Sequence, residues 1–138
     1  MEIRLEQLVV RLEQKDDYRE VENLTREAFW DVYRPGCSEH LVLHKLRNAK
    51  SFISDLDYVF VVDKKIIANI VYTKMFNEKG EMLNDVIAFG PISVHPEYQK
   101  RGIGKKIIEI SINRAKELGY KAVLITGNDK FYNPLGFE

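Results

Sequence analysis

The chain has 138 residues, of which 45% are hydrophobic, and this size and composition predict one domain with its own apolar core. Its 21 basic residues are balanced by 21 acidic residues, which argues against a chain built to bind nucleic acid or an anionic membrane. No apolar run is long enough to span a bilayer, no secretory signal pattern is present and the single Cys37 cannot form an internal disulfide, so we expect a cytoplasmic protein.

The N-terminal part of the chain predicts a strand followed by two helices. Residues 3–7 and 10–14 are nearly the same five residues, and the second copy alternates as the first strand of a sheet would. Residues 1–8 are interpreted as an N-terminal extension. A helix is expected from about 17 to 30, where apolar residues recur on one helical face, and Ser38 can cap a second helix that runs to about residue 50.

Two histidines in the second predicted helix are spaced as metal ligands can be. His40 and His44 are four residues apart, which puts both imidazoles on one helical face. A zincin motif would need Glu directly after the first histidine, where Leu41 stands, and no third ligand is evident. We therefore predict no metal site and interpret both histidines as surface or substrate-lining residues.

The middle of the chain predicts an antiparallel meander. Residues 58–62 and 66–76 read as two mostly buried strands of a hairpin, and a second turn leads to a strand over about 82–94. Gly90 and Pro91 lie inside this last strand, where both residue types form a poor hydrogen-bond ladder. A β-bulge or bend is therefore expected at that point.

The end of this strand leads through a glycine loop directly into a helix. The first N–H groups of a helix lack intrahelical partners and carry partial positive charge, and glycine lets an oxyanion approach the backbone. Basic residues on either side add positive charge, namely Lys100, Arg101, Lys105 and Lys106. Residues 90–106 therefore predict a cradle for a phosphate or diphosphate.

Two common phosphate-binding motifs can be compared with this loop by spacing. A Walker A loop needs Ser or Thr after its Gly-Lys pair, but Gly104-Lys105 is followed by Lys106, so that interpretation fails. A dinucleotide fingerprint needs a third glycine where Ile107 stands, and the preceding strand comes too late to open a βαβ unit. The dinucleotide interpretation is therefore weak.

The remaining elements predict the fold class. A long amphipathic helix from residue 103 ends at Gly119, and residues 122–126 form a short buried strand. The helical crossover makes this strand parallel to the strand over 82–94. The chain is thus expected to have an α+β fold with a mixed, mostly antiparallel central sheet flanked by helices. Ligands of open α/β sheets bind where two such strands separate, beside the helix start.

The glycine loop resembles the acyl-CoA loop of the GNAT superfamily of N-acetyltransferases. That pattern is Gln or Arg, two residues, Gly, one residue, then Gly or Ala, and Gln99-Lys100-Arg101-Gly102-Ile103-Gly104 matches every fixed position. Residues 92–98 and 131–137 also look like that family, so the resemblance covers most of the chain. Within the family, the chain looks similar to small predicted acetyltransferases of unknown acceptor. The resemblance implies a single GNAT-like domain over residues 1–138, with acetyl-CoA as co-substrate.

The resemblance also implies the residues of the site. In GNAT proteins a bulge in the strand before the loop frees backbone groups for the pantetheine arm, and the bulge expected here suits that use. Tyr132 matches the tyrosine that protonates the departing CoA thiolate; its unperturbed pKa of about 10 lies above the thiol's roughly 8.5, so it starts protonated. Alternatively, Tyr132 only packs the last helix on the sheet. The implied acetyl-CoA-binding residues are Ile92, Ser93, Val94, Gln99, Lys100, Arg101, Gly102, Ile103, Gly104, Lys105, Asn128 and Tyr132.

Two departures from the family pattern affect what the resemblance implies. Several members carry a glutamate base on the strand before the loop, and Ala88 occupies that position here. Asp85, His95 and Glu81 are possible bases, none of them compelling. The chain also stops at Glu138, where the family normally adds two further strands. Either the chain is truncated or another chain completes the sheet, since an open edge beside residues 122–126 favours a homodimer or edge-to-edge association.

Three functions are compatible with these features. The leading hypothesis is an acetyl-CoA-dependent N-acetyltransferase, in which the amine of a small-molecule or peptide acceptor attacks the thioester directly and Tyr132 assists the leaving sulfur. The competing hypothesis is a non-catalytic acyl-CoA-binding or sensing domain, which the missing glutamate and the missing strands favour. A third is nucleotide binding at the Lys-rich loop without CoA. The sequence does not identify the acceptor.

Overall fold

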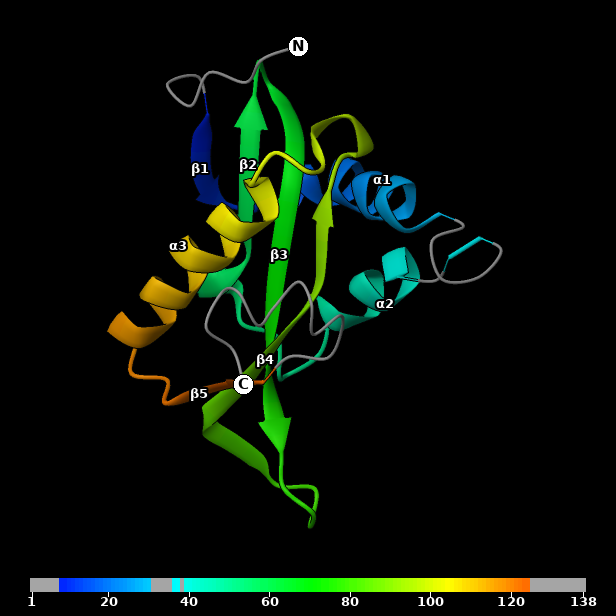
Figure 1. The fold of residues 1–138 in the computed structure, drawn as a ribbon. Coiled ribbons are helices and arrows are strands. Elements are labelled where there is room, and N and C mark those ends of the chain that lie inside the picture. Colours follow the sequence, from blue (N-terminus) through cyan, green and yellow to red (C-terminus); the bar gives the residue numbers. More distant parts are fainter. Residues whose placement is uncertain (1–7, 31–35, 38, 125–138) are drawn as a thin grey trace.

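The described part of the chain forms one mixed sheet with helices on both faces (Figure 1). A computed structural model describes residues 8–30, 36–37 and 39–124. The strands are β1 (Val9–Leu12), β2 (Tyr58–Val62), β3 (Lys65–Phe76), β4 (Met82–Val94) and β5 (Ala122–Leu124). The helices are α1 (Tyr18–Phe29), α2 (Glu39–Leu46) and α3 (Ile103–Glu117), with short 3-10 turns η2 (Lys15–Asp17), η3 (Ser54–Leu56) and η4 (Pro96–Tyr98). None of the described helices is long and apolar enough to cross a membrane.

The sheet follows the order β1-β2-β3-β4-β5, which confirms the predicted meander and fold class. Neighbouring strands from β1 to β4 are antiparallel, because each connection along this part of the chain returns to the adjacent strand. β5 pairs with β4 in parallel after the α3 crossover, as predicted. The predicted strand over 122–126 is confirmed for residues 122–124, and its last two residues lie outside the described part. The prediction that this strand is buried is wrong for the described residues, because Ala122 and Leu124 are exposed and Val123 is half-buried at the end of the described sheet.

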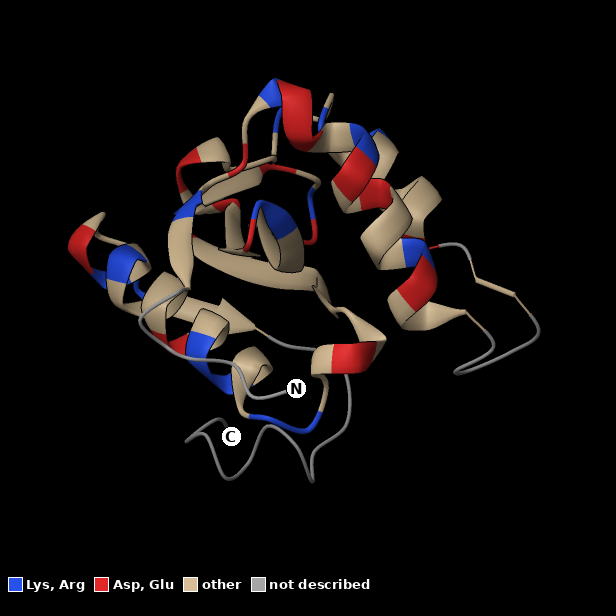
Figure 2. Ribbon diagram, turned by 90° about the horizontal axis from the view of Figure 1, so that it is seen from above, with Lys and Arg blue, Asp and Glu red and all other residues tan. Residues whose placement is uncertain are grey.

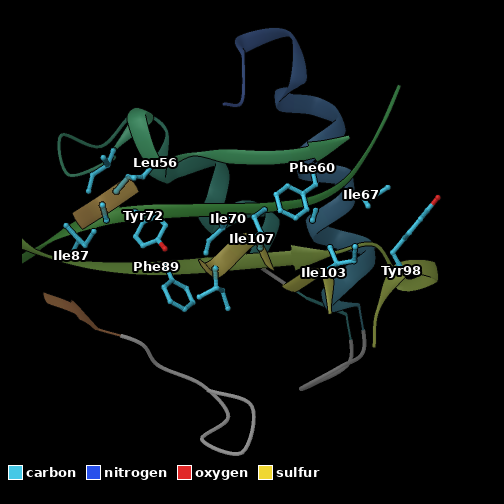
Figure 3. Packing of buried hydrophobic residues seen from close by; sticks show 14 of the residues in the cluster. Leu56, Phe60, Ile67, Ile70, Tyr72, Ile87, Phe89, Tyr98, Ile103 and Ile107 are labelled. Atoms are coloured by element: carbon cyan, nitrogen blue, oxygen red, sulfur yellow. The ribbon is translucent and has the colours of Figure 1, made fainter. Parts of the chain in front are cut away.

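The two faces of the sheet are covered by different helices. The apolar side of α3 packs on one face, where its Ile103 and Ile107 contact a cluster that includes Phe60, Ile70 and Tyr72 (Figure 3). On the other face, α1 and α2 contribute a separate cluster of Val21, Leu24 and Leu43 that packs against Val59, Ile66 and Val71. The two clusters make the central strands buried on both sides, as their continuous apolar runs predicted.

A buried hydroxyl pair fixes α3 to the sheet. The Tyr72 hydroxyl lies 2.7 Å from Ser111 Oγ, and Ser111 donates to the Ile107 carbonyl at 2.7 Å. Since Ser111 uses its proton on that carbonyl, Tyr72 donates to Ser111. Burial raises the pKa of Tyr72 to about 12, so this hydroxyl stays protonated and structural.

The second predicted helix is shorter than expected. Its predicted cap, Ser38, lies outside the described residues, and α2 ends at Leu46 rather than near residue 50. Leu43 is buried and Leu46 is half-buried, but Leu41 is 56% exposed. With so few apolar contacts, this eight-residue helix depends on tertiary interactions at its C-terminal end.

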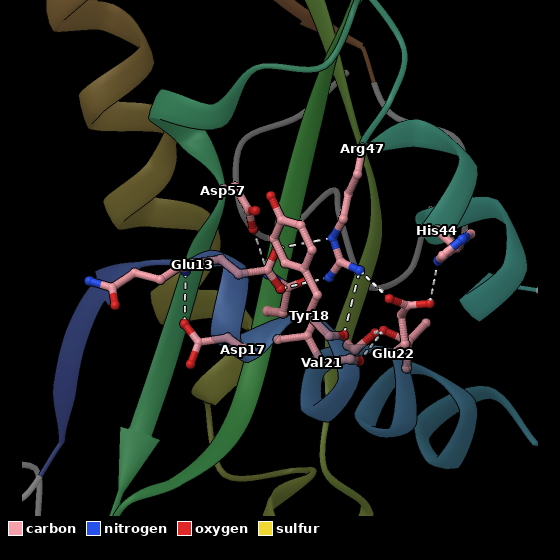
Figure 4. Close-up of polar contacts among 12 residues, drawn as sticks. Glu13, Asp17, Tyr18, Val21, Glu22, His44, Arg47 and Asp57 are labelled. Carbon is pink, nitrogen blue, oxygen red and sulfur yellow. Dashed lines mark hydrogen bonds and ion pairs between the residues drawn. The ribbon is translucent and has the colours of Figure 1, made fainter.

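One of these interactions is a buried ionic cluster centred on Arg47 (Figure 4). Its guanidinium forms two hydrogen bonds to the Glu13 carboxylate, at 2.7 and 3.2 Å, and a further ion pair with Glu22 of α1. It also stacks over the Tyr18 ring, 4.0 Å from the centroid. The cluster joins the end of α2 to α1 and to the segment after β1. It also contains Asp57, whose carboxyl hydrogen-bonds to Glu13.

Candidate functional site

β4 contains a bulge in its second half. The register with β3 shifts by one residue at Gly90 and Pro91, which together oppose the single residue Val71. This confirms the bulge predicted from the two residues. Gly90 has a φ of 143°, a backbone conformation that L side chains rarely adopt. Before the bulge, β5 pairs with residues 86–88 of β4.

Beyond the bulge, β4 directs backbone groups away from β3. The N–H of His95 donates to the Ile67 carbonyl at 2.8 Å, which identifies this pair as a hydrogen-bonded one in the antiparallel ladder. Hydrogen-bonded pairs alternate with non-hydrogen-bonded pairs along such a ladder. Ile92 and Val94 belong to non-hydrogen-bonded pairs with β3, so their backbone N–H and C=O groups point to the opposite edge of β4. The side-chain amide of Gln99 reaches the Val94 carbonyl at 3.0 Å from that side. No described strand pairs with this part of the edge.

The loop that follows leads into the N-terminus of α3. Lys100 and Gly102 have left-handed φ values of 63° and 78°, and a Cβ atom added to Gly102 would meet nothing within 4 Å. The first helical hydrogen bond runs from the Lys106 N–H to the Gly102 carbonyl at 3.1 Å. The N–H groups of residues 103–105 therefore precede the hydrogen-bonded part of the helix. The Lys and Arg residues of this loop are blue in the ribbon of Figure 2.

The predicted binding residues have different roles in this arrangement. Lys100 and Lys105 are exposed beside the helix start, whereas Ile103 is buried in the core and leaves only its backbone to the loop. The Arg101 guanidinium lies 5.9 Å from the centroid of the Tyr98 ring. The structure thus brings the loop residues and the free edge of β4 together. Most of the groups that they offer to a ligand are backbone N–H groups rather than side chains.

Ser93 differs from its two neighbours in the predicted site. Its side chain is buried and donates to Thr25 Oγ1 at 3.1 Å, and Thr25 in turn donates to the Val21 carbonyl at 3.0 Å. Ser93 therefore attaches β4 to α1, on the face opposite α3. The other two predicted residues, Asn128 and Tyr132, lie outside the described residues.

None of the three possible bases lies free beside the bulge. His95 Nδ1 accepts the Glu97 N–H at 3.2 Å, and its Nε2 lies 3.3 Å from Glu27 Oε2, so both ring nitrogens are engaged. Asp85 precedes Gly90 by five residues, a separation of about 16 Å along a strand. Glu81 is farther away, in the turn before β4.

The two histidines of α2 make separate contacts. His44 Nδ1 lies 2.9 Å from Glu22 Oε1, and His40 Nδ1 lies 3.6 Å from the sulfur of Cys37. Within the described ranges, no group of three or more His, Cys, Asp and Glu side chains is placed to hold a metal ion.

A second feature of the site was not predicted from the sequence. The outward side of α1 and the residue after His95 line a pocket formed by Asn23, Arg26, Glu27, Trp30 and Pro96. Exposed helical residues follow no motif, so only the approach of α1 to the end of β4 reveals that they share a pocket. The one available signal was Trp30, a large aromatic residue at the end of an amphipathic helix.

Comparisons with known proteins identify the family. The family model of the acetyltransferase (GNAT) domain matches residues 55–138. The chain is 32% identical over 75 residues to the uncharacterized N-acetyltransferase YjhQ of Escherichia coli K12, a match that covers 54% of this chain and 41% of YjhQ. It is 25% identical over 131 residues to the uncharacterized N-acetyltransferase YhbS of the same strain, covering 95% of this chain and 74% of YhbS.

Solved structures have the same fold. A GNAT family acetyltransferase from Brucella melitensis, crystallised in complex with acetyl-CoA, superposes with a TM-score of 0.86 at 25% identity, over 95% of this chain and 82% of that one. Escherichia coli YhbS in complex with CoA superposes with a TM-score of 0.83 at 22% identity, over 96% and 69% of the two chains. By its family match and its fold, the chain belongs to the GNAT family of acetyltransferases.

Proposed function

We propose that this protein transfers an acetyl group from acetyl-CoA directly to a primary amine of a small-molecule or peptide acceptor. The observation that carries the proposal is the free edge of β4 at Ile92 and Val94 beside the open N-terminus of α3. A strand edge can hydrogen-bond an extended amide chain, and a helix start can bind phosphate. Acetyl-CoA carries both groups in one molecule.

The donor is proposed to lie along β4 with its diphosphate at the loop. The N–H groups of residues 103–105 would bind the diphosphate, and the exposed Lys100 and Lys105 would add charge. The backbone of Ile92 and Val94 would pair with the amides of the pantetheine arm. This pairing directs the thioester toward the bulge at Gly90.

The proposed reaction is a single displacement at the thioester carbon. The amine nitrogen forms the new C–N bond, the C–S bond breaks, and backbone N–H groups at the bulge stabilise the charge that develops on the carbonyl oxygen. The thiolate takes a proton from Tyr132, and water removes the excess proton from the amine because Ala88 supplies no carboxylate. No covalent enzyme intermediate is required.

The Tyr132→Phe variant tests this assignment. The lost hydroxyl acts mainly in the transition state, so kcat should fall roughly tenfold or more while the Kd of acetyl-CoA stays unchanged. CoA-thiol release is measured against a panel of amines, peptides and polyamines, and the Kd by calorimetry. Tyr120→Phe, which removes another tyrosine hydroxyl, is the matched control and should retain full turnover. Equal turnover in the two variants would return Tyr132 to a packing role.

A second candidate function is acyl-CoA binding without catalysis, which Ala88 favours because it replaces the strand glutamate of several family members. This candidate gains support if the parent protein binds CoA but acetylates nothing in the panel or in cell extract. ATP is tested beside CoA to distinguish a CoA site from a nucleotide site. Full binding of ATP together with no binding of CoA would identify a nucleotide site.

We also propose that residues 1–138 form one cytoplasmic domain that associates as a homodimer. β5 is the last strand of the described sheet, and its Leu124 is 50% exposed. An exposed apolar strand favours association with a second copy. Light scattering should give a dimer at micromolar concentrations; a monomer throughout that range would reject the assembly without affecting the proposed chemistry.

A further inference from the structure

The pocket between α1 and the end of β4 adjoins the proposed donor site. Its lining includes Pro96, which follows Val94 by two residues. The backbone groups of Val94 lie on the free edge of β4. The contact between Glu27 and His95, at 3.3 Å, attaches this part of α1 to the strand end. The pocket lies on the α1 side of the sheet, whereas α3 and its N-terminus lie on the other. A molecule in the pocket would therefore approach the β4 edge from the side opposite α3.

Arg26 is held in this pocket by an aromatic ring. Its guanidinium carbon lies 4.7 Å from the centroid of the Trp30 ring, which is 49% exposed. Gly36 lies near the same indole, since a Cβ atom added to it would be 3.7 Å from the ring. The indole thus has the guanidinium near its ring and Gly36 nearby, a setting that restricts its orientation.

The guanidinium has no acidic partner among the described residues. The acid in the pocket, Glu27, pairs with His95 instead. The nearby Glu22 on α1 pairs with Arg47 and His44. Arg26 therefore lines the pocket without a carboxylate partner among the described residues, while its contact with the Trp30 ring restricts its movement. A guanidinium ordered in this way binds a carboxylate through two parallel hydrogen bonds and loses less side-chain entropy than a mobile cation.

We infer that Arg26 determines acceptor specificity and that the acceptor is an amine that also carries a carboxylate, bound by Arg26 on the Trp30 ring. This inference rests on the proposed acetyl transfer. The four residue-to-residue steps from Ile92 to Pro96 span about 13 Å in an extended chain, which sets the scale over which the amine and the carboxylate are separated. Candidate acceptors therefore range from free amino acids to short peptides.

Trp30 makes the inference directly measurable, because it is the single tryptophan of the chain. Protein with and without saturating CoA is titrated with product-like probes, N-acetylated amino acids and N-acetylated di- and tripeptides, while tryptophan emission is followed. Each probe is paired with its C-terminal carboxamide. At least one carboxylate should give a saturable change, with a Kd roughly tenfold or more below that of its amide.

Two variants on the same helix complete the test. Arg26→Gln should weaken binding of the carboxylate probe roughly tenfold or more and leave the amide unchanged. Arg19→Gln, an exposed arginine outside the pocket, should behave as the parent. Equal binding of acid and amide, no emission change with any carboxylate, or an unaffected Arg26→Gln variant would each overturn the inference. Calorimetry with CoA separates the two proposals, because absent CoA binding contradicts the proposed function, whereas intact CoA binding without carboxylate preference contradicts only the role of Arg26.

Discussion

Glu13 and Asp57 are two acidic residues whose side chains lie in the interior of the protein. Glu13 follows a short strand, and its side chain is fully buried against Arg47. Asp57 is 3% exposed and accepts a hydrogen bond from Asn69 at 2.9 Å. Burial, followed by the hydrogen bond and charge of Glu13, raises the pKa of Asp57 to about 9. Asp57 is therefore protonated at neutral pH.

This proton makes stability depend on pH. The folded-state pKa of Asp57 lies above the unfolded value of 3.8, so its contribution is fully present below that value and is lost as pH rises toward about 9. Within this window, a group that takes up one proton on folding lowers the free energy of unfolding by about 1.4 kcal/mol for each unit by which the pH rises. Asp57→Asn keeps a donor for Glu13 and an acceptor for Asn69 but binds no proton. Urea unfolding should show a smaller loss of stability between pH 6 and 8 in this variant than in the parent; equal losses would contradict the assignment.

Arg47 is predicted to matter more for stability than any surface cation. Arg47→Met keeps most of the stem but leaves the buried Glu13 carboxylate without its partner, at a cost of about 3–5 kcal/mol. The measurement is the free energy of unfolding in urea. Arg114→Met is the control, since Arg114 pairs with Glu117 on the surface of α3 and should leave the unfolding midpoint unchanged. Similar effects in both variants would refute the special role of Arg47.

Among the elements, β4 and α3 were the most predictable because their signals are local. Gly90-Pro91 within an apolar run cannot form a regular ladder, and the bulge lies at these residues. The start of α3 follows the glycine loop directly, and Gly119 has the left-handed φ of 93° that terminates a helix. The length of α2 was predicted less well, because only tertiary packing distinguishes its buried leucines from the exposed Leu41.

The start of α3 can be tested by a substitution in its first turn. Gly104→Val places a branched side chain in the first turn, where the donor's diphosphate is proposed to bind, and should abolish stabilisation by CoA. In the parent, CoA at about one hundred times its Kd should stabilise the fold by roughly 2.7 kcal/mol. Thermal unfolding with and without CoA gives the comparison, and circular dichroism checks the fold. Asn113→Val, at an exposed position on the same helix, should keep the full stabilisation by CoA. If Gly104→Val is also fully stabilised by CoA, the diphosphate does not bind at this loop.

Most of the sheet order could be predicted, and the site only in part. Short connections make β2, β3 and β4 neighbours, and the α3 crossover places β5 beside β4 in parallel. β1 is joined to β2 through α1 and α2, and no sequence pattern indicated which strand it pairs with. The loop was found because its pattern is contiguous in sequence. The pocket around Arg26 joins α1 to a residue seventy positions later, Pro96, and such an encounter has no sequence signal. For the same reason, no sequence signal indicated that the Ser93 hydroxyl donates to Thr25 on α1.

Acetyl-CoA is proposed to bind along the free edge of β4 and at the start of α3. An amide NMR titration of the isotope-labelled protein with acetyl-CoA tests this placement residue by residue. Saturable shifts are expected at Ile92, Val94 and residues 102–105, with amides in β1 and β2 unaffected. ATP at the same concentration should not reproduce the shifts at Ile92 and Val94, because it lacks a pantetheine arm. Shifts confined to other elements, or identical shifts with ATP along β4, would show that the donor does not bind there.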